Sequence, residues 1–394
     1  MRKTRLNVFL LLLLLLNGIQ GACAQEISWS RPAAFQQKVV PLLKGKRVGL
    51  VVNQTSVLEG GKVHLLDALL AEEVDVKKVF APEHGFRGTA EAGAEVADSR
   101  DVRTGIPVVS IYGKNKKPTG GQLGDLDVVV FDIQDVGARF YTYISTMHYV
   151  MEVCAANGKE FIVLDRPNPN DYVDGPVRRK GFESFVGMHP IPVLHGLTVG
   201  ELARMINGEK WLNTADTCRL QVVTMEHWRH GDACHLPVKP SPNLPNPQAV
   251  RLYPSLCLFE GTIVSVGRGT DFPFQVLGCP DARYGRFQFT PVSLPGFDAN
   301  PLQKDKRCYG IDLREIPFEG GFSLRFLLDF YRKAGKDRRA FFSRPEWFDL
   351  LAGSGELRRQ ITGGMTEKEI RASWQPELEV YKQMRKKYLL YEEW

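Results

Sequence analysis

The chain has 394 residues, of which 43% are hydrophobic and 24% are charged. This composition is typical of a folded globular protein and excludes a collagen-like or largely disordered chain. The length predicts two domains, and the formal charge of +6 raises the question of a polyanionic partner.

The N-terminal residues account for half of that charge. Three basic residues within the first five precede an apolar run over 8–16, and Ala22-Cys23-Ala24 then supplies a cleavage site of small residues. This order predicts a secretory signal peptide over residues 1–24, since the apolar run is shorter than the roughly 20 residues of a membrane-spanning helix. Without it the formal charge is +3. We therefore expect a periplasmic protein with no membrane segment in the mature chain and no nucleic-acid partner.

The cysteines leave two questions open. An acylated Cys23 would make the chain a lipoprotein, although Gln20 stands where such signals usually have an aliphatic residue. Six further cysteines remain, and none forms a CxxC pair, which argues against a zinc knuckle. An oxidising compartment permits a disulfide such as Cys218 with Cys234, while buried free thiols are the alternative.

Strand and helix patterns alternate through the first half. The expected strands are 47–53, 74–81, 106–112, 127–133 and 160–165, and the expected helices are 62–72 and 141–156. Near-continuous Val and Ile runs between helices are typical of a parallel sheet that is buried on both faces. Residues 25–240 are therefore predicted to form an open α/β domain.

Five prolines between residues 236 and 249 predict a connector, because proline lacks an amide donor. We place the domain boundary there, with a second, smaller α/β (α+β) domain over 241–394. Expected helices in this part are 321–335, one that starts after Thr366 with Glu369 in capping-box spacing, and a third over 376–390.

Unusual polar residues follow each of the five expected strands. In chain order they are Asn53; Glu83, His84 and Arg87; Tyr112; Asp132, Gln134 and Asp135; and Arg166 and Asn168. Ligands of open α/β sheets bind beyond the carboxyl ends of the strands. These residues therefore predict one polar cleft, although any single one would also suit a turn or a helix cap.

Several familiar chemistries lack their motifs. The sequence has no GxGxxG after the first strand, no GxxxxGK[ST] and no GxSxG, so no nucleotide cofactor and no hydrolase triad is predicted. His84, His189 and His195 lack HExxH spacing, and no metal is predicted. A metal-dependent hydrolase in which these histidines join Asp132 is kept as an alternative.

Carboxylate chemistry is the remaining option. Glu83 lies between Phe80 and Phe86, and apolar shielding would favour the protonated carboxyl group that a general acid needs. An ion pair with Arg87 is the structural alternative. In the second half, Glu260 and Arg268 are polar residues beside glycines within an apolar stretch. Asp132, Asp135 and Glu260 are the candidate partners of Glu83.

Long blocks of the chain, taken together, resemble one known family. FAPEHGFRG, FDIQDVGARFYTYISTM, VLDRPNPN, PVLHGLTVGELA, PSPNLPNPQAVRLYPSLCLFEGT and SVGRGTDFPFQVLGCP are similar to the NamZ-type exo-β-N-acetylmuramidases. The resemblance implies a Rossmann-like first domain with its site in a cleft against the second domain. It also implies an exo-acting glycosidase that releases terminal, non-reducing β-1,4-linked N-acetylmuramic acid from peptidoglycan fragments.

The resemblance assigns roles to residues only in part. Glu83 matches the family's PEHG-type glutamate and is the expected acid, while Asp132, Glu260, Tyr141 and Tyr143 stay open as its partner. Glycoside hydrolysis needs an acid together with a base or nucleophile. The lactyl carboxylate of muramic acid calls for a cation, for which Arg139, Arg166 and Arg268 are the candidates. The other expected substrate contacts are Asn53, His84, Arg87, Gln134, Asn168 and His195. A cell-wall-binding protein without turnover is the second alternative.

Overall fold

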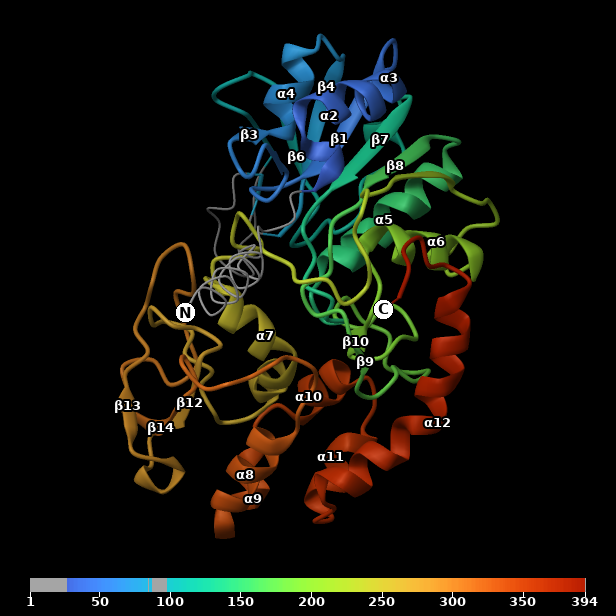
Figure 1. Cartoon of the computed structure of the whole chain (residues 1–394). Coiled ribbons are helices and arrows are strands. Elements are labelled where there is room, and N and C mark those ends of the chain that lie inside the picture. The colour runs from blue at the N-terminus through green and yellow to red at the C-terminus, as the bar shows by residue number, and fades with distance from the viewer. Residues whose placement is uncertain (1–26, 84, 87–97, 394) are drawn as a thin grey trace, which may run out of the picture.

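The first half of the chain is built on a seven-stranded sheet (Figure 1). A computed structural model describes residues 27–83, 85–86 and 98–393. The strands are β1 (Val48–Val52), β4 (Val76–Ala81), β5 (Ser99–Arg100), β6 (Pro107–Ser110), β7 (Val128–Asp132), β8 (Glu160–Leu164) and β11 (Arg219–Val223). Their order is β11-β8-β7-β1-β4-β6-β5, and all neighbours are parallel except β5 and β6. Without edge strand β5, this is the doubly wound order, which confirms the predicted α/β class.

Alternate residues of the strands enter different cores. Leu50 and Val130 pack with the helices on one face, whereas Val51 and Phe131 belong to the core on the other. The first face is covered by α2 (Pro32–Lys38), α3 (Val40–Leu43) and α4 (Leu65–Ala71), and the second by α5 (Tyr143–Ala156) and α6 (Val199–Gly208). Side chains of a strand alternate between faces, so a sheet covered twice needs the continuous apolar strands that the sequence contains.

Two short antiparallel pairs of strands lie outside the main sheet, and one of them moves the start of an expected helix. The helix expected from residue 62 begins at Leu65, because β3 (Val63–His64) pairs with β2 (Val57–Leu58). The His64 ring caps α4 by accepting a hydrogen bond from the Leu66 amide at 3.2 Å. A second antiparallel pair of strands, β9 (Val173–Asp174) with β10 (Leu194–His195), follows β8.

The second half combines helices with a small antiparallel sheet of order β12-β14-β13. The strands are β12 (Val276–Cys279), β13 (Phe287–Phe289) and β14 (Cys308–Asp312), and the helices are α7 (Pro247–Leu256), α8 (Arg325–Lys333), α9 (Arg338–Phe341), α10 (Pro345–Ala352), α11 (Glu356–Thr362) and α12 (Glu367–Lys386). Short 3-10 helices occur in both halves. Those of the first half are η1 (Ser28–Ser30) and η2 (Gly121–Leu123), and those of the second are η3 (Cys257–Gly261), η4 (Ala282–Tyr284) and η5 (Gly335–Asp337).

The two last expected helices are one helix in the structure. The predicted capping box is present, with Thr366 and Glu369 each accepting from the other's backbone amide. Pro376 lies inside α12, where it removes one backbone hydrogen bond. Trp374 and Tyr381 lie on the buried side of the helix, and their packing holds it together across the proline.

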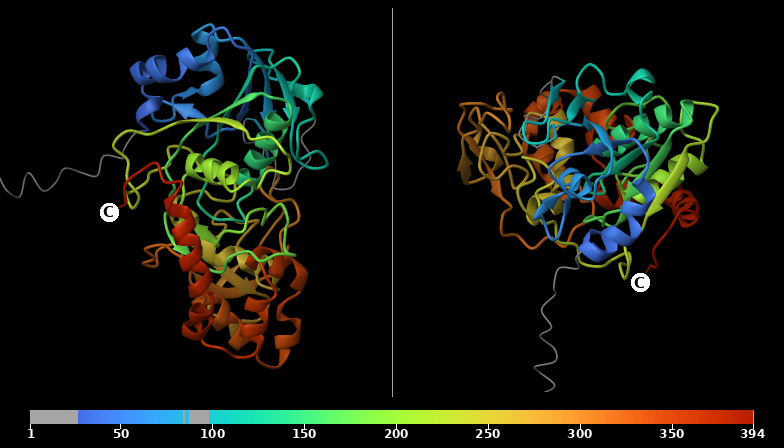
Figure 2. Two further views of the ribbon diagram at one scale, coloured as in Figure 1. Left: turned by 90° about the vertical axis from the view of Figure 1, so that its right-hand side faces the viewer. Right: turned by 90° about the horizontal axis from the view of Figure 1, so that it is seen from above.

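The two halves of the chain share one hydrophobic core. The largest cluster of buried residues joins α5 and α6 of the first half to α7, α8, α10 and α12 of the second. After α12 the chain returns to the first half (Figure 2). There Tyr391 donates to Asp165 at 2.6 Å. A division at 240/241 stays a prediction, and contacts across it are extensive.

One further expectation concerns the cysteines. The six described cysteines are all free thiols, so the disulfide considered for Cys218 and Cys234 is not formed.

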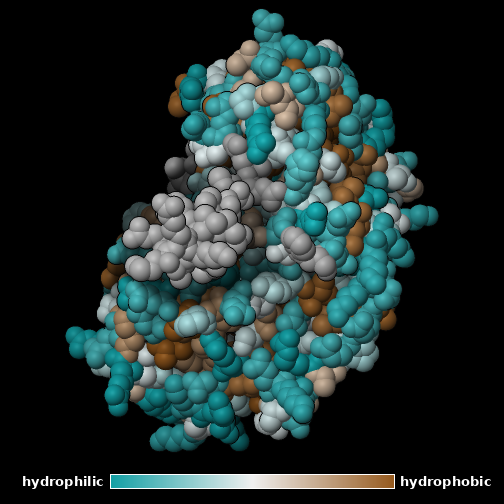
Figure 3. Space-filling model, in the orientation of Figure 1, coloured by the Kyte–Doolittle hydropathy of each residue, from teal (hydrophilic) through white to brown (hydrophobic). Residues whose placement is uncertain are grey.

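Within the described residues, no helix is long and apolar enough to cross a membrane. The face of the molecule shown in Figure 3 is mostly hydrophilic outside the grey atoms, and its hydrophobic residues form small groups.

Candidate active site

A cavity of about 590 Å³ lies where the two halves of the chain meet. The first half contributes the residues that follow β4, β6 and β7, among them Glu83, Tyr112, Tyr141, Thr142 and Tyr143. The second half contributes Tyr253, Glu260, Arg268, Arg344 and Trp347. The cavity therefore lies beyond the carboxyl ends of the parallel strands, as ligand sites of open α/β sheets do.

Two hydroxyl groups hold the carboxyl group of Glu83. Tyr112 donates to Oε1 at 2.8 Å, and Thr142 donates to Oε2 at 2.8 Å. Burial raises the pKa of Tyr112, and the nearby charge of Glu83 raises it further. Tyr112 is therefore protonated at neutral pH and available as a donor. Because these residues follow three different strands, the sheet itself positions Glu83.

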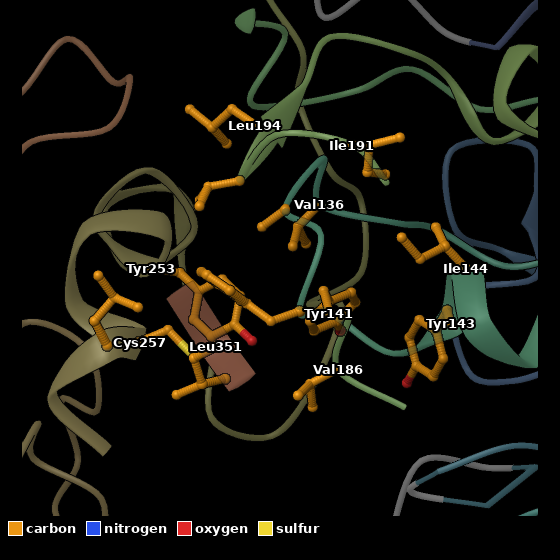
Figure 4. Packing of buried hydrophobic residues seen from close by; sticks show 14 of the residues in the cluster. Val136, Tyr141, Tyr143, Ile144, Val186, Ile191, Leu194, Tyr253, Cys257 and Leu351 are labelled. Carbon is orange, nitrogen blue, oxygen red and sulfur yellow. The ribbon is translucent and has the colours of Figure 1, made fainter. Parts of the chain in front are cut away.

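Two buried tyrosines line the cavity beside Glu83. The rings of Tyr141 and Tyr143 meet edge to face at 5.0 Å, and Tyr253 of α7 meets Tyr141 at 5.8 Å (Figure 4). The Tyr141 hydroxyl lies beside Ser241, and the Tyr143 hydroxyl lies beside Asn53 and Tyr141. Burial raises the pKa of both phenols, and the charge of Glu83 adds to the shift. Both are therefore neutral and able to donate to a bound molecule.

An ion pair from the second half also lines the cavity. Arg268 donates through Nε at 3.0 Å and Nη2 at 2.8 Å, and both bonds reach Oε1 of Glu260. The guanidinium also lies 5.0 Å from the centre of the Phe274 ring. Gly261 follows Glu260 and packs on α10 so closely that a Cβ would lie 2.5 Å from Cβ of Phe348. The glycine beside Glu260 is thus needed for close packing.

Asp132 and Arg166 are paired with each other in the interior. Arg166 donates through Nε at 2.5 Å and Nη2 at 3.0 Å to the two oxygens of Asp132, and also contacts the Val57 carbonyl oxygen. The side chains are 0% and 2% exposed, and neither lines the cavity. The geometry therefore brings neither Asp132 to Glu83 nor Arg166 to a substrate in this cavity.

Arg139 and Gln134 bind backbone carbonyl groups. Arg139 donates to the carbonyl oxygens of Pro176, Ile191 and Leu351, and so joins the first half to α10. Burial lowers its pKa to about 9, and nearby Arg178 adds to the effect. Gln134 donates to the carbonyl oxygens of Asp135 and Pro167. These contacts hold loops in place, and neither side chain lines the cavity.

Three further candidates also lie outside the cavity lining. Asn53 accepts from the amide and hydroxyl of Thr55, as in an Asx turn, and Asn168 donates to the Leu197 carbonyl oxygen. His195 accepts from the Leu197 amide, and burial lowers its pKa to about 3. His84 and Arg87 lie outside the described residues.

The structure thus unites Glu83, Tyr141, Tyr143, Glu260 and Arg268 from the expected set. Sequence reasoning did not select Thr142, Arg344 or Trp347, and it noted Tyr112 only as a residue that follows a strand. Position after a strand was the available signal for Tyr112. No local sequence pattern marks Arg344 or Trp347 as site residues. Arg344 directly precedes α10 and Trp347 lies within it, so both reach the cavity from a distant part of the chain. Among the described residues, no group of three or more His, Cys, Asp or Glu side chains is placed to hold a metal ion.

Comparison with known proteins covers nearly the whole described chain. The family model for the N-terminal part of exo-β-N-acetylmuramidase NamZ matches residues 48–248, and the model for its C-terminal part matches 251–391. The peptidoglycan β-N-acetylmuramidase NamZ of Bacillus subtilis (strain 168) is 40% identical over 374 residues, which cover 89% of this chain and 88% of that protein.

Two solved structures of DUF1343-family proteins from Bacteroides fragilis NCTC 9343 share the fold. One superposes with a TM-score of 0.83 at 43% identity, covering 92% of this chain and 98% of that one. The other has a TM-score of 0.79 at 32% identity, covering 91% and 97%. Both family models match in order and the curated relative aligns over most of both chains, so this protein belongs to the exo-β-N-acetylmuramidase NamZ family.

Proposed function

We propose that the protein is an exo-acting glycosidase that releases terminal, non-reducing β-1,4-linked N-acetylmuramic acid from peptidoglycan fragments. The curated relative from Bacillus subtilis, which is named a peptidoglycan β-N-acetylmuramidase, supports the substrate class. The observation that carries the proposal is the placement of Glu83, held by Tyr112 and Thr142, in a cavity that Glu260 also lines.

Glu83 is the general acid in this proposal. A hydroxyl group can donate to a carboxylate and can also accept from a protonated carboxyl group. Tyr112 and Thr142 therefore suit both states of a residue that gives up a proton to the leaving oxygen and takes one back. No metal is assigned a role in this step.

Glu260 is the second carboxylate in the proposal. Both bonds from Arg268 reach Oε1, so Arg268 neutralises Glu260 while leaving Oε2 for a water molecule or the sugar. The neutral hydroxyl of Tyr143 can donate a hydrogen bond to an oxygen of the bound sugar. The anomeric form of the first product, read by NMR, distinguishes a nucleophilic Glu260 (retention) from a base (inversion).

We also propose export to the periplasm with removal of residues 1–24. The charged, apolar and small-residue regions at the start of the sequence support it. The intact mass of the protein recovered from a periplasmic fraction tests this proposal. A chain that begins at Gln25 agrees with it, whereas a lipid adduct on Cys23 in the membrane fraction contradicts it.

The test of substrate specificity compares a chromogenic β-N-acetylmuramide with the matching β-N-acetylglucosaminide. We expect kcat/KM to be at least about 10-fold higher for the muramide, since the added lactyl carboxylate can make charge-assisted hydrogen bonds. Equal rates would overturn the specificity. Thermal stabilisation by the muramide without any product would favour a binding protein, and loss of activity with a chelator would favour a metal-dependent hydrolase.

A further inference from the structure

Two of the three cations in the cavity, Lys116 and Arg344, form no ion pair with an acid among the described residues. Five charged side chains line the cavity, namely Glu83, Lys116, Glu260, Arg268 and Arg344. Glu260 and Arg268 neutralise each other in an ion pair in which Nε and Nη2 of Arg268 both donate to Oε1. Among the described residues, no acidic side chain forms an ion pair with Arg344, which lies next to the Trp347 ring at 5.3 Å. The lining therefore has more cations than acids, and the described residues supply no acidic partner for Arg344.

The backbone of Arg344 is held firmly to the wall that carries Glu260. Its amide donates to the Gly261 carbonyl oxygen at 3.0 Å, and its own carbonyl oxygen accepts from the Phe348 amide at 3.0 Å. Arg344 precedes Pro345, the first residue of α10, and the proline disfavours helical backbone at Arg344. Arg344 is thus hydrogen-bonded to Gly261, the residue next to Glu260.

The alternatives for binding an anion are weaker. Arg139 and Arg166 are buried away from the cavity, and Arg268 is already paired with Glu260. Lys116 lies 4.5 Å from the centre of the Phe185 ring and offers a point charge. An arginine presents a planar fork that matches the two oxygens of a carboxylate. Of the cations in the cavity, Arg344 alone combines that fork with the absence of an acidic partner among the described residues.

We propose that Arg344 binds the lactyl carboxylate of the terminal N-acetylmuramic acid and is the residue that distinguishes it from N-acetylglucosamine. The inference rests on the proposed function for the identity of the sugar. The two sugars differ only in the lactyl ether, so a cation dedicated to that carboxylate gives selectivity without altering the contacts that the sugars share. Glu83 and Glu260 then act on the bond, and Arg344 positions the ring through its substituent.

The test uses a chromogenic β-N-acetylmuramide with a free lactyl carboxylate and the same compound with that carboxylate as its methylamide. We expect Arg344→Met to lower kcat/KM for the free acid by about 10- to 100-fold, chiefly through KM, and to change kcat/KM for the neutral methylamide less than about 3-fold. Arg344→Lys keeps the charge and should recover part of the loss. Arg339→Met removes an exposed arginine outside the cavity and is the matched control.

Equal losses on both compounds would overturn the proposal, because they would give Arg344 a structural role. Unchanged kinetics in Arg344→Met, or the discriminating loss in Lys116→Met instead, would overturn it as well. Calorimetric binding of N-acetylmuramic acid and of its methylamide to wild-type and Arg344→Met protein gives the same comparison without turnover. If the wild type binds N-acetylmuramic acid through Arg344 but releases no product, the proposed catalytic function fails while this inference stands.

Discussion

Glu83 and Asp132 show how surroundings assign different roles to two carboxyl groups beyond the carboxyl ends of parallel strands. Glu83 faces the cavity and is held by two neutral hydroxyls, whereas Asp132 is buried against Arg166. The sequence predicted that both residues lie at the same edge of the sheet. It could not separate them, because the partner of Asp132 is 34 residues away and the two hydroxyls come from other strand ends.

The buried ion pair leads to a prediction about stability. Asp132→Asn leaves the Arg166 charge without its counterion in the interior, and we expect the free energy of unfolding to fall by about 3–5 kcal/mol. Urea denaturation measures this loss. Activity per folded molecule at low temperature should stay near that of the wild type. A large fall in kcat with unchanged stability would instead return Asp132 to the catalytic candidates.

At the scale of elements, strands were the most predictable part of the fold. Residues 128–131 of the expected strand 127–133 are apolar at every position, and all four lie in β7. Helix α7 was not expected, because Pro247 seemed to extend the proline-rich connector. Pro247 is in fact the first residue of α7, and Asn246 caps the helix by accepting from the Ala249 amide. A proline can end a helix or strand, and it can also be the first residue of a helix. The spacing of prolines alone does not distinguish these two roles.

The segment after α12 is fastened to the first half through His230. The His230 amide donates to the Glu392 carbonyl oxygen at 2.9 Å, and its ring bonds to Asp171 and Glu201. The Leu390 amide also donates to Glu201 at 2.9 Å. Burial alone would lower the pKa of His230, but the hydrogen bonds and charges of the two acids outweigh burial and raise it to about 9.

This shift predicts a pH dependence of stability. A pKa that is higher in the folded state means that the contribution of His230 is complete below pH 6.5 and is lost as pH rises to about 9. We expect the melting temperature to decline between about pH 7 and 9.5, and the decline to be smaller in His230→Gln. Differential scanning fluorimetry in matched buffers measures both. An equal decline in the variant would contradict the assignment to His230.

At the scale of the whole molecule, the sequence suggested two units and the structure shows a shared interior. The contact between Tyr391 and Asp165 joins residues that are 226 positions apart, and the bond from Arg139 to Leu351 spans 212. No local pattern encodes such contacts, so the return of the chain to the first half and the contribution of Arg344 and Trp347 to the cavity did not follow from the sequence. What the sequence did indicate is that the site lies where the halves meet.

The shared core predicts cooperative unfolding of the described chain. Because the largest cluster includes residues of both halves, we expect a single transition by scanning calorimetry, with equal calorimetric and van't Hoff enthalpies. A substrate-site ligand should raise the temperature of that one transition. Two separate transitions, of which the ligand moves only one, would show that the halves fold independently.

The central claim is that Glu83 protonates the leaving group in the cavity between the halves. The most direct measurement compares wild type with Glu83→Gln on the disaccharide N-acetylmuramic acid-β-1,4-N-acetylglucosamine and on an aryl β-N-acetylmuramide with a good leaving group. We predict a loss in kcat of about 100- to 10,000-fold on the disaccharide and a much smaller loss on the aryl compound, which needs little protonation. A folded variant that keeps most of its activity on the disaccharide would contradict the account.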